Sequence, residues 1–124
     1  MADYAPKFRP GVDVTYAAGG TITGGNVVFL SAAGTVQATS AASAVVVGVA
    51  SRDAVTGDSV AICRGGVQRC VSAAAITAGQ PLKSAASGRV TPMAIGTDPQ
   101  DQYIGFALTA AGGAGTVVDV QWKA

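Results

Sequence analysis

Short apolar runs separated by glycine-containing turns recur along the whole chain. Apolar and polar residues alternate over 12–16, as in a strand with one buried face, and 45–50 is an unbroken apolar run typical of a strand buried on both faces. The pattern predicts about nine short strands in one compact, antiparallel all-β sandwich or barrel. The expected strands are 12–16, 26–30, 45–50, 59–64, 67–72, 76–83, 90–93, 103–108 and 117–122. The segment 38–44 contains only Ala, Ser and Thr, which predicts a loop or a frayed helical turn.

The chain is internally duplicated. Residues 22–36 and 76–90 align without a gap and share Ile, Thr, Gly, Ala, Gly and Val at matching positions. A second similarity follows each copy, because Val47-Gly48-Val49-Ala50 resembles Ile104-Gly105-Phe106-Ala107. The sequence therefore predicts a fold in which one β-unit occurs twice.

Gly65-Gly66 lies between two expected strands and predicts a β-hairpin turn. In that hairpin Cys63 and Cys70 share a face but are diagonal neighbours, about 7–8 Å apart, which is too far for a disulfide. We expect two free thiols, with a disulfide to a neighbouring subunit as the alternative. Arg64 and Arg69 share the other face of this hairpin with Val60, Ile62, Val67 and Val71, and such a mixed face predicts a rim or a subunit contact.

The composition supports a β fold with one domain. Valine far outnumbers leucine, and 17 of the 124 residues are glycine. Branched side chains such as valine pack well on pleated sheets and lose freedom in helices. A chain of this length buries enough surface to fold as one unit. We expect a single β domain over 12–124.

Residues 1–11 differ from the rest of the chain. Pro6 and Pro10 disfavour a helix, and Tyr4 and Phe8 are aromatic side chains of the kind that occupy grooves on a partner. We expect an extended N-terminal arm, with a frayed tail as the alternative.

Catalytic chemistry has few candidates in this sequence. The chain has no histidine, so Ser-His-Asp and Cys-His systems and histidine metal sites are excluded. Its carboxylates are all aspartates, and the pairs Asp53 with Asp58 and Asp98 with Asp101 lie in expected turns, where Asp bonds nearby backbone. A calcium site at Asp98 and Asp101 is the alternative, but it lacks the oxygen spacing of a known motif. We expect no enzyme activity, no metal and no cofactor.

The charge and the chain's first residues bear on partners and location. The net charge is +1, and the arginines are scattered among few aromatic residues, so neither nucleic acid nor an acidic membrane is an expected partner. The N-terminus has no charged start followed by an apolar run, and no segment approaches the roughly 20 apolar residues of a membrane span. We expect a soluble protein made in the cytoplasm.

Several weak motifs in a fixed order resemble the capsid decoration, or cement, proteins of tailed bacteriophages. The resemblance covers residues 9–122. The motifs that carry it are Arg9-Pro10-Gly11, Ile22-Thr23-Gly24-Gly25, Val47-Gly48-Val49-Ala50, Thr56-Gly57-Asp58-Ser59-Val60, Gly66-Val67, Ile76-Thr77-Ala78-Gly79 and Ile104-Gly105-Phe106-Ala107.

This resemblance implies a nonenzymatic virion protein on the outer surface of the expanded head, commonly a trimer, with a β-clip or β-tulip type of fold. Its partner would be the major capsid protein, and binding would stabilise the head against internal DNA pressure. The arm would bind the capsid. Its candidate contacts are Tyr4, Lys7, Phe8, Arg9 and Pro10.

Two other classes of function stay open at this point. The first is a carbohydrate or host-surface binding module of a virion, which would need exposed aromatic platforms. The one tryptophan, Trp122, lies in a terminal strand where core packing is expected. The second is an enzyme or ligand-binding β-clip domain cut from a larger protein, which would need a convergent polar cluster that this sequence does not offer.

Overall fold

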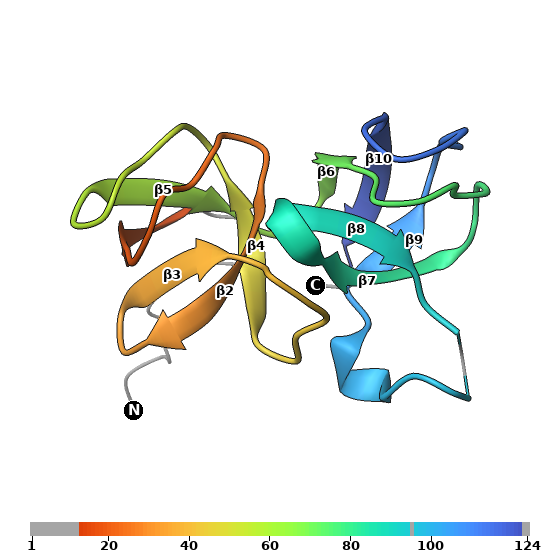
Figure 1. The fold of residues 1–124 in the computed structure, drawn as a ribbon, viewed down its shortest axis with the longest axis horizontal. Coiled ribbons are helices and arrows are strands. Elements are labelled where there is room, and N and C mark those ends of the chain that lie inside the picture. The colour runs from red at the N-terminus through yellow and green to blue at the C-terminus, as the bar shows by residue number, and fades with distance from the viewer. Residues whose placement is uncertain (1–12, 95, 123–124) are drawn as a thin grey trace, which may run out of the picture.

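The computed structural model describes residues 13–94 and 96–122. These residues form ten strands and two short 3₁₀ helices, arranged as two halves side by side (Figure 1). The first half contains β1 (Val14–Ala18), β2 (Val27–Ala32), β3 (Thr35–Ala38), β4 (Val46–Ala50) and β5 (Ser59–Cys63). The second half contains β6 (Val67–Val71), β7 (Pro81–Ala85), η1 (Ala86–Gly88), β8 (Arg89–Pro92), η2 (Gln100–Gln102), β9 (Gly105–Ala107) and β10 (Val117–Trp122). In this part of the chain, no helix has the length and apolarity of a membrane span.

The two halves have the same topology. The first is a closed barrel with the order β1-β3-β2-β4-β5, and the second is a five-stranded sheet with the order β6-β10-β9-β7-β8. When β6 to β10 are matched with β1 to β5, the second order is the first order read in the opposite direction around the barrel, starting from the first strand of each half. In the first half, β1 closes the barrel by pairing in parallel with β3, where Ala18 is opposite Val36. In the second half, the edge strands β6 and β8 meet at the parallel bridge between Ser72 and Val90. These pairs occupy matching positions of the repeat, so the predicted duplication is confirmed.

A second matching pair of bridges connects the loops. Ile22 bridges Ala54 in the first half, and Ile76 bridges Ala111 in the second. All four side chains are buried. The predicted all-β fold is confirmed, with each copy of the repeat forming its own sheet.

The glycine shared by the two similar tetrapeptides is required by close packing of strands. A Cβ at Gly48 would lie 2.3 Å from the carbonyl oxygen of Cys63, and a Cβ at Gly105 would lie 2.1 Å from that of Gln121. No side chain fits at such distances, so only glycine lets β4 approach β5 and β9 approach β10.

The core consists of two clusters. The interior of the barrel holds one cluster: Ala18, Ile22, Val28, Val36, Ala50, Ala54, Val60 and Ile62. The second cluster fills the other half, and Val27 and Val49 of the barrel also belong to it. These two valines lie opposite each other in the register of β2 and β4, and Val28 next to Val27 points inward. Val27 and Val49 therefore lie on the outside of the barrel and are buried against the second half.

Polar contacts also join the halves. Thr39 Oγ1 donates a hydrogen bond to the carbonyl of Ala85 at 2.8 Å. Ser84 Oγ donates to the carbonyl of Ala41 and accepts from the backbone N–H of Ser43, both at 2.9 Å. Thr39 and Ser84 are both buried. The loop between β3 and β4, which the sequence left open as a loop or a helical turn, is thus a loop fixed to β7.

The predicted hairpin at Gly65-Gly66 is wrong. Both glycines have positive φ, 64° and 61°, as a tight hairpin turn needs. However, β5 pairs with β1 and β4, and β6 pairs with β10. Since both edges of β5 are occupied within the barrel, β6 cannot pair with it, and the glycines connect the two halves.

Two strand predictions also need correction. The sequence missed β3, a four-residue strand that completes the barrel between β1 and β2. The strand expected over 76–83 begins at Pro81, because Ile76 makes only an isolated bridge and a turn follows it. The remaining expected strands are present with shifts of a few residues at their ends, and β10 has the expected bounds.

Candidate functional site

The residues expected in the N-terminal arm lie outside the described residues. These are Tyr4, Lys7, Phe8, Arg9 and Pro10. The described chain begins at Asp13, whose carboxylate accepts a hydrogen bond from the Cys63 thiol at 3.9 Å. Burial raises the pKa of Cys63, and the negative charge of Asp13 raises it further. Asp13 therefore lies beside the C-terminal end of β5, near the connection between the halves.

The two expected subunit-contact residues, Arg64 and Arg69, are not brought together on one hairpin. Arg64 follows β5 and is partly buried, and its Nε has no hydrogen-bond partner among the described residues. Arg69 lies on β6, is exposed and stands opposite Asp119 of β10 in the sheet register. The prediction that both share one face was wrong because their strands belong to different sheets.

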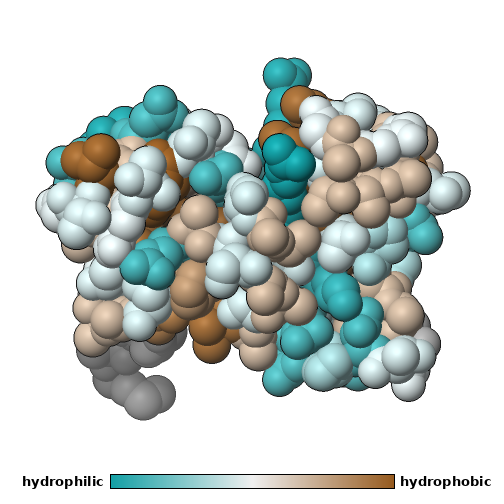
Figure 2. Space-filling model, viewed as in Figure 1, coloured by the Kyte–Doolittle hydropathy of each residue, from teal (hydrophilic) through white to brown (hydrophobic). Residues whose placement is uncertain are grey.

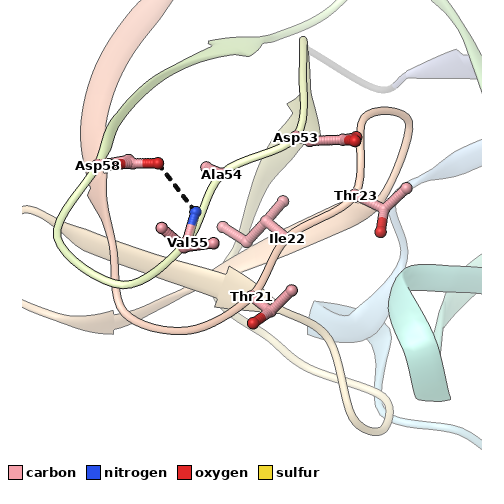
Figure 3. A pocket seen from close by; sticks show the side chains of 7 residues that line it. All are labelled: Thr21, Ile22, Thr23, Asp53, Ala54, Val55 and Asp58. Carbon is pink, nitrogen blue, oxygen red and sulfur yellow. Dashed lines mark hydrogen bonds between the residues drawn. The ribbon is translucent and has the colours of Figure 1, made fainter.

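A shallow hollow with a volume of about 290 Å³ lies on the first half, between two loops (Figure 3). Asp53 and Asp58 lie at either end of one loop, with Ala54 between them. The lining residues are Thr21, Ile22, Thr23, Asp53, Ala54, Val55 and Asp58.

Both carboxylates at this hollow are bound to backbone amides. Asp58 accepts from the N–H of Val55 at 3.1 Å, as drawn in Figure 3, which is the local turn contact that the sequence predicts. Asp53 instead accepts from the N–H of Gly24 at 2.8 Å, a contact across the barrel end. The two aspartates therefore stabilise loops, and the hollow offers no unpaired acid for chemistry.

In the other aspartate pair, Asp98 and Asp101, the Asp98 carboxylate also has a structural role. Asp98 accepts from the N–H of Ala94 at 2.9 Å and pairs with Lys83 Nζ at 3.0 Å. The amide hydrogen bond, and then the Lys83 ammonium, lower the pKa of the Asp98 carboxyl. Asp101 lies exposed in η2. Within 13–94 and 96–122, no group of three metal-ligating acidic or thiol side chains forms, so these residues do not support the alternative calcium site.

Both cysteines are free, as expected, although the hairpin on which that expectation rested does not exist. Cys70 is fully buried in the second core cluster. Burial raises its pKa to about 12, so the thiol stays protonated at neutral pH and is a packing residue. Trp122 is also in this cluster, as the sequence predicts for the terminal strand.

The sequence did not identify an exposed apolar surface on the second half. Its residues are Val67, Phe106, Leu108 and Val117, which we call the second-sheet face. The register places Phe106 opposite Gln121, and Gln121 opposite Val67, so their side chains project from the same side of the sheet. On the view in Figure 2, by contrast, hydrophobic and hydrophilic residues are interspersed.

A signal for this face was present in the alternation of β10. Val118, Val120 and Trp122 are buried, so Val117 and its alternate neighbours face outward. The sequence placed Val67 on a mixed face with Arg64 and Arg69, predicted to be a rim or a subunit contact, but it placed that face on a hairpin with β5 and not beside β10. Comparing which alternate residues of neighbouring strands share a side of the sheet would have revealed the face, but this comparison needs the order β6-β10-β9, which the sequence did not predict.

Comparisons with known proteins agree with this architecture. The family model described as phage cement protein matches residues 7–122. The N base of the head fiber protein gp8.5 of bacteriophage phi29 has a similar fold, with a TM-score of 0.66 and 19% identity over 90% of this chain and 93% of that chain. No curated protein sequence gives a significant match. Because the family model spans nearly the whole chain, this protein belongs to the phage cement protein family.

Proposed function

We propose that this protein decorates the outer surface of the expanded phage head, binds the major capsid protein and stabilises the shell against the pressure of packaged DNA. The observation that carries the proposal is the family match over residues 7–122. Membership of that family makes the chain a phage structural protein associated with the capsid. The expanded state, the outer surface and the capsid partner are the parts we propose.

The contact with the capsid would be made by the N-terminal arm, through Tyr4, Lys7, Phe8, Arg9 and Pro10. An extended segment can add a strand to an exposed sheet edge and place alternate side chains in pockets. In this chain Tyr4 and Phe8 would fill pockets, while Lys7 and Arg9 would bind polar groups at the rim. Among the described residues, the members of both core clusters all follow Asp13, and we expect the arm to bind without disturbing their contacts.

Binding only to the expanded lattice would stabilise it by mass action. A ligand at a hundredfold excess over its dissociation constant contributes about 2.7 kcal/mol per site. If the chains form trimers, as we propose, three arms act together and each bound arm raises the effective concentration of the others. Many sites on one head would then resist internal pressure together.

A nonenzymatic role fits the chemistry of the described residues. The aspartates near the hollow are hydrogen-bonded to backbone, and Cys70 is buried and protonated at neutral pH. Arg64 and Arg69 remain our candidates for contacts between subunits. They would act at different positions, since they lie in different sheets.

Cosedimentation with phage heads tests this function. The full chain and a variant lacking Met1 to Pro10 are mixed with purified expanded and unexpanded heads, and bound copies are counted per major capsid subunit. We expect the full chain to saturate expanded heads at a ratio close to one copy per capsid subunit and to leave unexpanded heads bare. The truncated chain should remain folded, by circular dichroism, and lose binding by at least about tenfold.

Three results would contradict the proposal. Equal binding to unexpanded heads would remove the stabilising mechanism, because a ligand shifts an equilibrium only by its differential affinity. A few copies per head would indicate a vertex or fiber component. Undiminished binding by the truncated chain would show that the arm is not the capsid contact.

A further inference from the structure

The internal duplication allows the second-sheet face to be compared with the matching face of the barrel. In the barrel, Val27 and Val49 lie opposite each other on the outside of β2 and β4. At the matching positions of the second half, Pro81 and Phe106 lie opposite each other on β7 and β9. Val49 is buried, with 5% of its surface exposed, whereas Phe106 is 38% exposed. The same apolar face is thus covered in one half and uncovered in the other.

The cover on the barrel is provided by one end of the second half. Gly88 of η1 donates its N–H to the carbonyl of Thr39, and a Cβ at Gly88 would lie 2.6 Å from the side chain of Asn26, the residue before Val27. Ser84, next to this end, is 1% exposed and bonded to the β3–β4 loop. The outside of the first half therefore packs against the end of the second half.

The corresponding end of the first half has no cover among the described residues. In the repeat, Leu30 matches Ser84, and both pair with matching valines, Val36 and Val90. Leu30 is 41% exposed. At Gly34, which matches Gly88, an added Cβ would have no described neighbour within 4 Å.

Val45 belongs to the same uncovered region. Its carbonyl accepts a hydrogen bond from the N–H of Leu30, and its side chain is 51% exposed. We call Leu30, Gly34 and Val45 the first-barrel end. This end is apolar and open, while its counterpart in the second half is the region that the barrel covers.

We infer that the second-sheet face of one molecule packs against the first-barrel end of a second copy of this chain, repeating between molecules the contact that joins the two halves within each molecule. This inference deepens the self-association proposed above. The contact is heterologous, because two different surfaces meet, and such contacts close into rings when the rotation between copies permits. A ring of three copies would leave neither apolar surface uncovered.

The placement of the two surfaces suits this arrangement. In Figure 1, β4 lies beside the second half, β9 lies on the side of the second half away from the barrel, and the C-terminal end of β2 points away from the second half. The second-sheet face and the first-barrel end thus lie toward opposite ends of the molecule. A molecule can contact one neighbour at each end.

Sedimentation velocity of charged variants tests the inference in the absence of heads. Phe106→Lys alters the second-sheet face, and Leu30→Lys alters the first-barrel end. Val55→Lys is the matched control, because Val55 is 57% exposed and lies at the hollow on neither surface. We expect the wild type and the control to form one closed oligomer at high concentration, and each test variant to weaken assembly by at least about tenfold.

An equimolar mixture of the two test variants separates this contact from a symmetric one. Each mixed pair retains one intact interface, between the unaltered second-sheet face of L30K and the unaltered first-barrel end of F106K. We expect the mixture to form dimers and no larger ring, although each variant alone is monomeric. A symmetric contact between two second-sheet faces would leave L30K fully assembled, and in the mixture the L30K chains would pair only with one another while F106K stayed monomeric.

A monomeric wild type at the highest attainable concentration, an assembled L30K, or a monomeric mixture would each overturn the inference. Thermal unfolding shows whether the variants fold, and Val67→Lys, on the same face at a 53% exposed position, replaces F106K if that variant does not. A wild type that binds heads but stays monomeric would overturn this contact and leave the decoration function standing. A wild type that forms the ring but binds no heads would support this contact and contradict the decoration function.

Discussion

At the scale of single residues, the burial of the Cys70 thiol makes the free energy of unfolding depend on pH. Its thiol lies in the second core cluster, and burial raises its pKa from 9.0 to about 12. In the unfolded chain the thiol loses its proton near its ordinary pKa, whereas the folded chain keeps it. Between pH 9 and pH 12 the unfolded state thus binds fewer protons than the folded state. The free energy of unfolding is therefore unaffected by this group below pH 9 and falls as pH rises above it.

The expected slope from Cys70 approaches about 1.4 kcal/mol per pH unit between these pKa values. Urea unfolding of the wild type and of Cys70→Ala, measured from about pH 7 to about pH 11, isolates it in the difference between the two curves. The alanine variant loses packing and is less stable at neutral pH, so the two curves should converge as pH rises. Parallel curves would show that the thiol is not protected by the core.

At the scale of elements, the sequence predicted the strands where one local signal was sufficient. β10 was found with its true bounds because apolar residues span it and glycines end the preceding turn. β3 was missed, since its four residues carry one buried valine and depend on pairing with β1 and β2. The hairpin at Gly65-Gly66 failed for a related reason. Its glycines have the φ values of a hairpin turn, but the choice of partner was decided by distant strands.

The contact between β7 and the β3–β4 loop gives a prediction at this scale. Ser84→Ala removes the hydroxyl that bonds both the Ala41 carbonyl and the Ser43 amide. Leaving such groups without partners costs about 1–3 kcal/mol, which urea unfolding should show as a lower midpoint. Faster hydrogen exchange at the Ser43 amide would locate the effect.

Ser31→Ala, in β2, is the matched control for this serine substitution, because Ser31 is exposed and its hydroxyl makes only a long contact of 3.4 Å with the Thr35 carbonyl among the described residues. We expect its unfolding midpoint to equal that of the wild type. Equal midpoints for both variants would mean that water replaces the Ser84 hydroxyl without cost, and that the Thr39 hydrogen bonds and the packing of Val27 and Val49 hold the halves together.

At the scale of the whole molecule, the sequence predicted the repeated unit but not the way its copies pack. The matching residues of the two copies show that a β-unit is duplicated, and the structure gives both copies one topology. Which copy of a shared face is covered depends on three-dimensional contact, so Val49 and Phe106 could not be distinguished beforehand. For the same reason the candidate site was predicted only in part. Arg69 was placed correctly beside Val67 and Val71 on β6, but the surrounding face needed the sheet order.

The matched positions Val49 and Phe106 also separate folding from assembly. Val49→Ala removes apolar contacts within one molecule, so it should lower the free energy of unfolding by about 1–3 kcal/mol. Phe106→Ala removes a side chain that is already partly in water, so it should change the unfolding of the monomer less and weaken self-association more. Urea unfolding at low concentration, followed by Trp122 fluorescence, measures the first effect, and sedimentation velocity at high concentration measures the second. Since Val49 packs in the same core cluster as Trp122, an unchanged midpoint in V49A would show that this packing does not stabilise the second half.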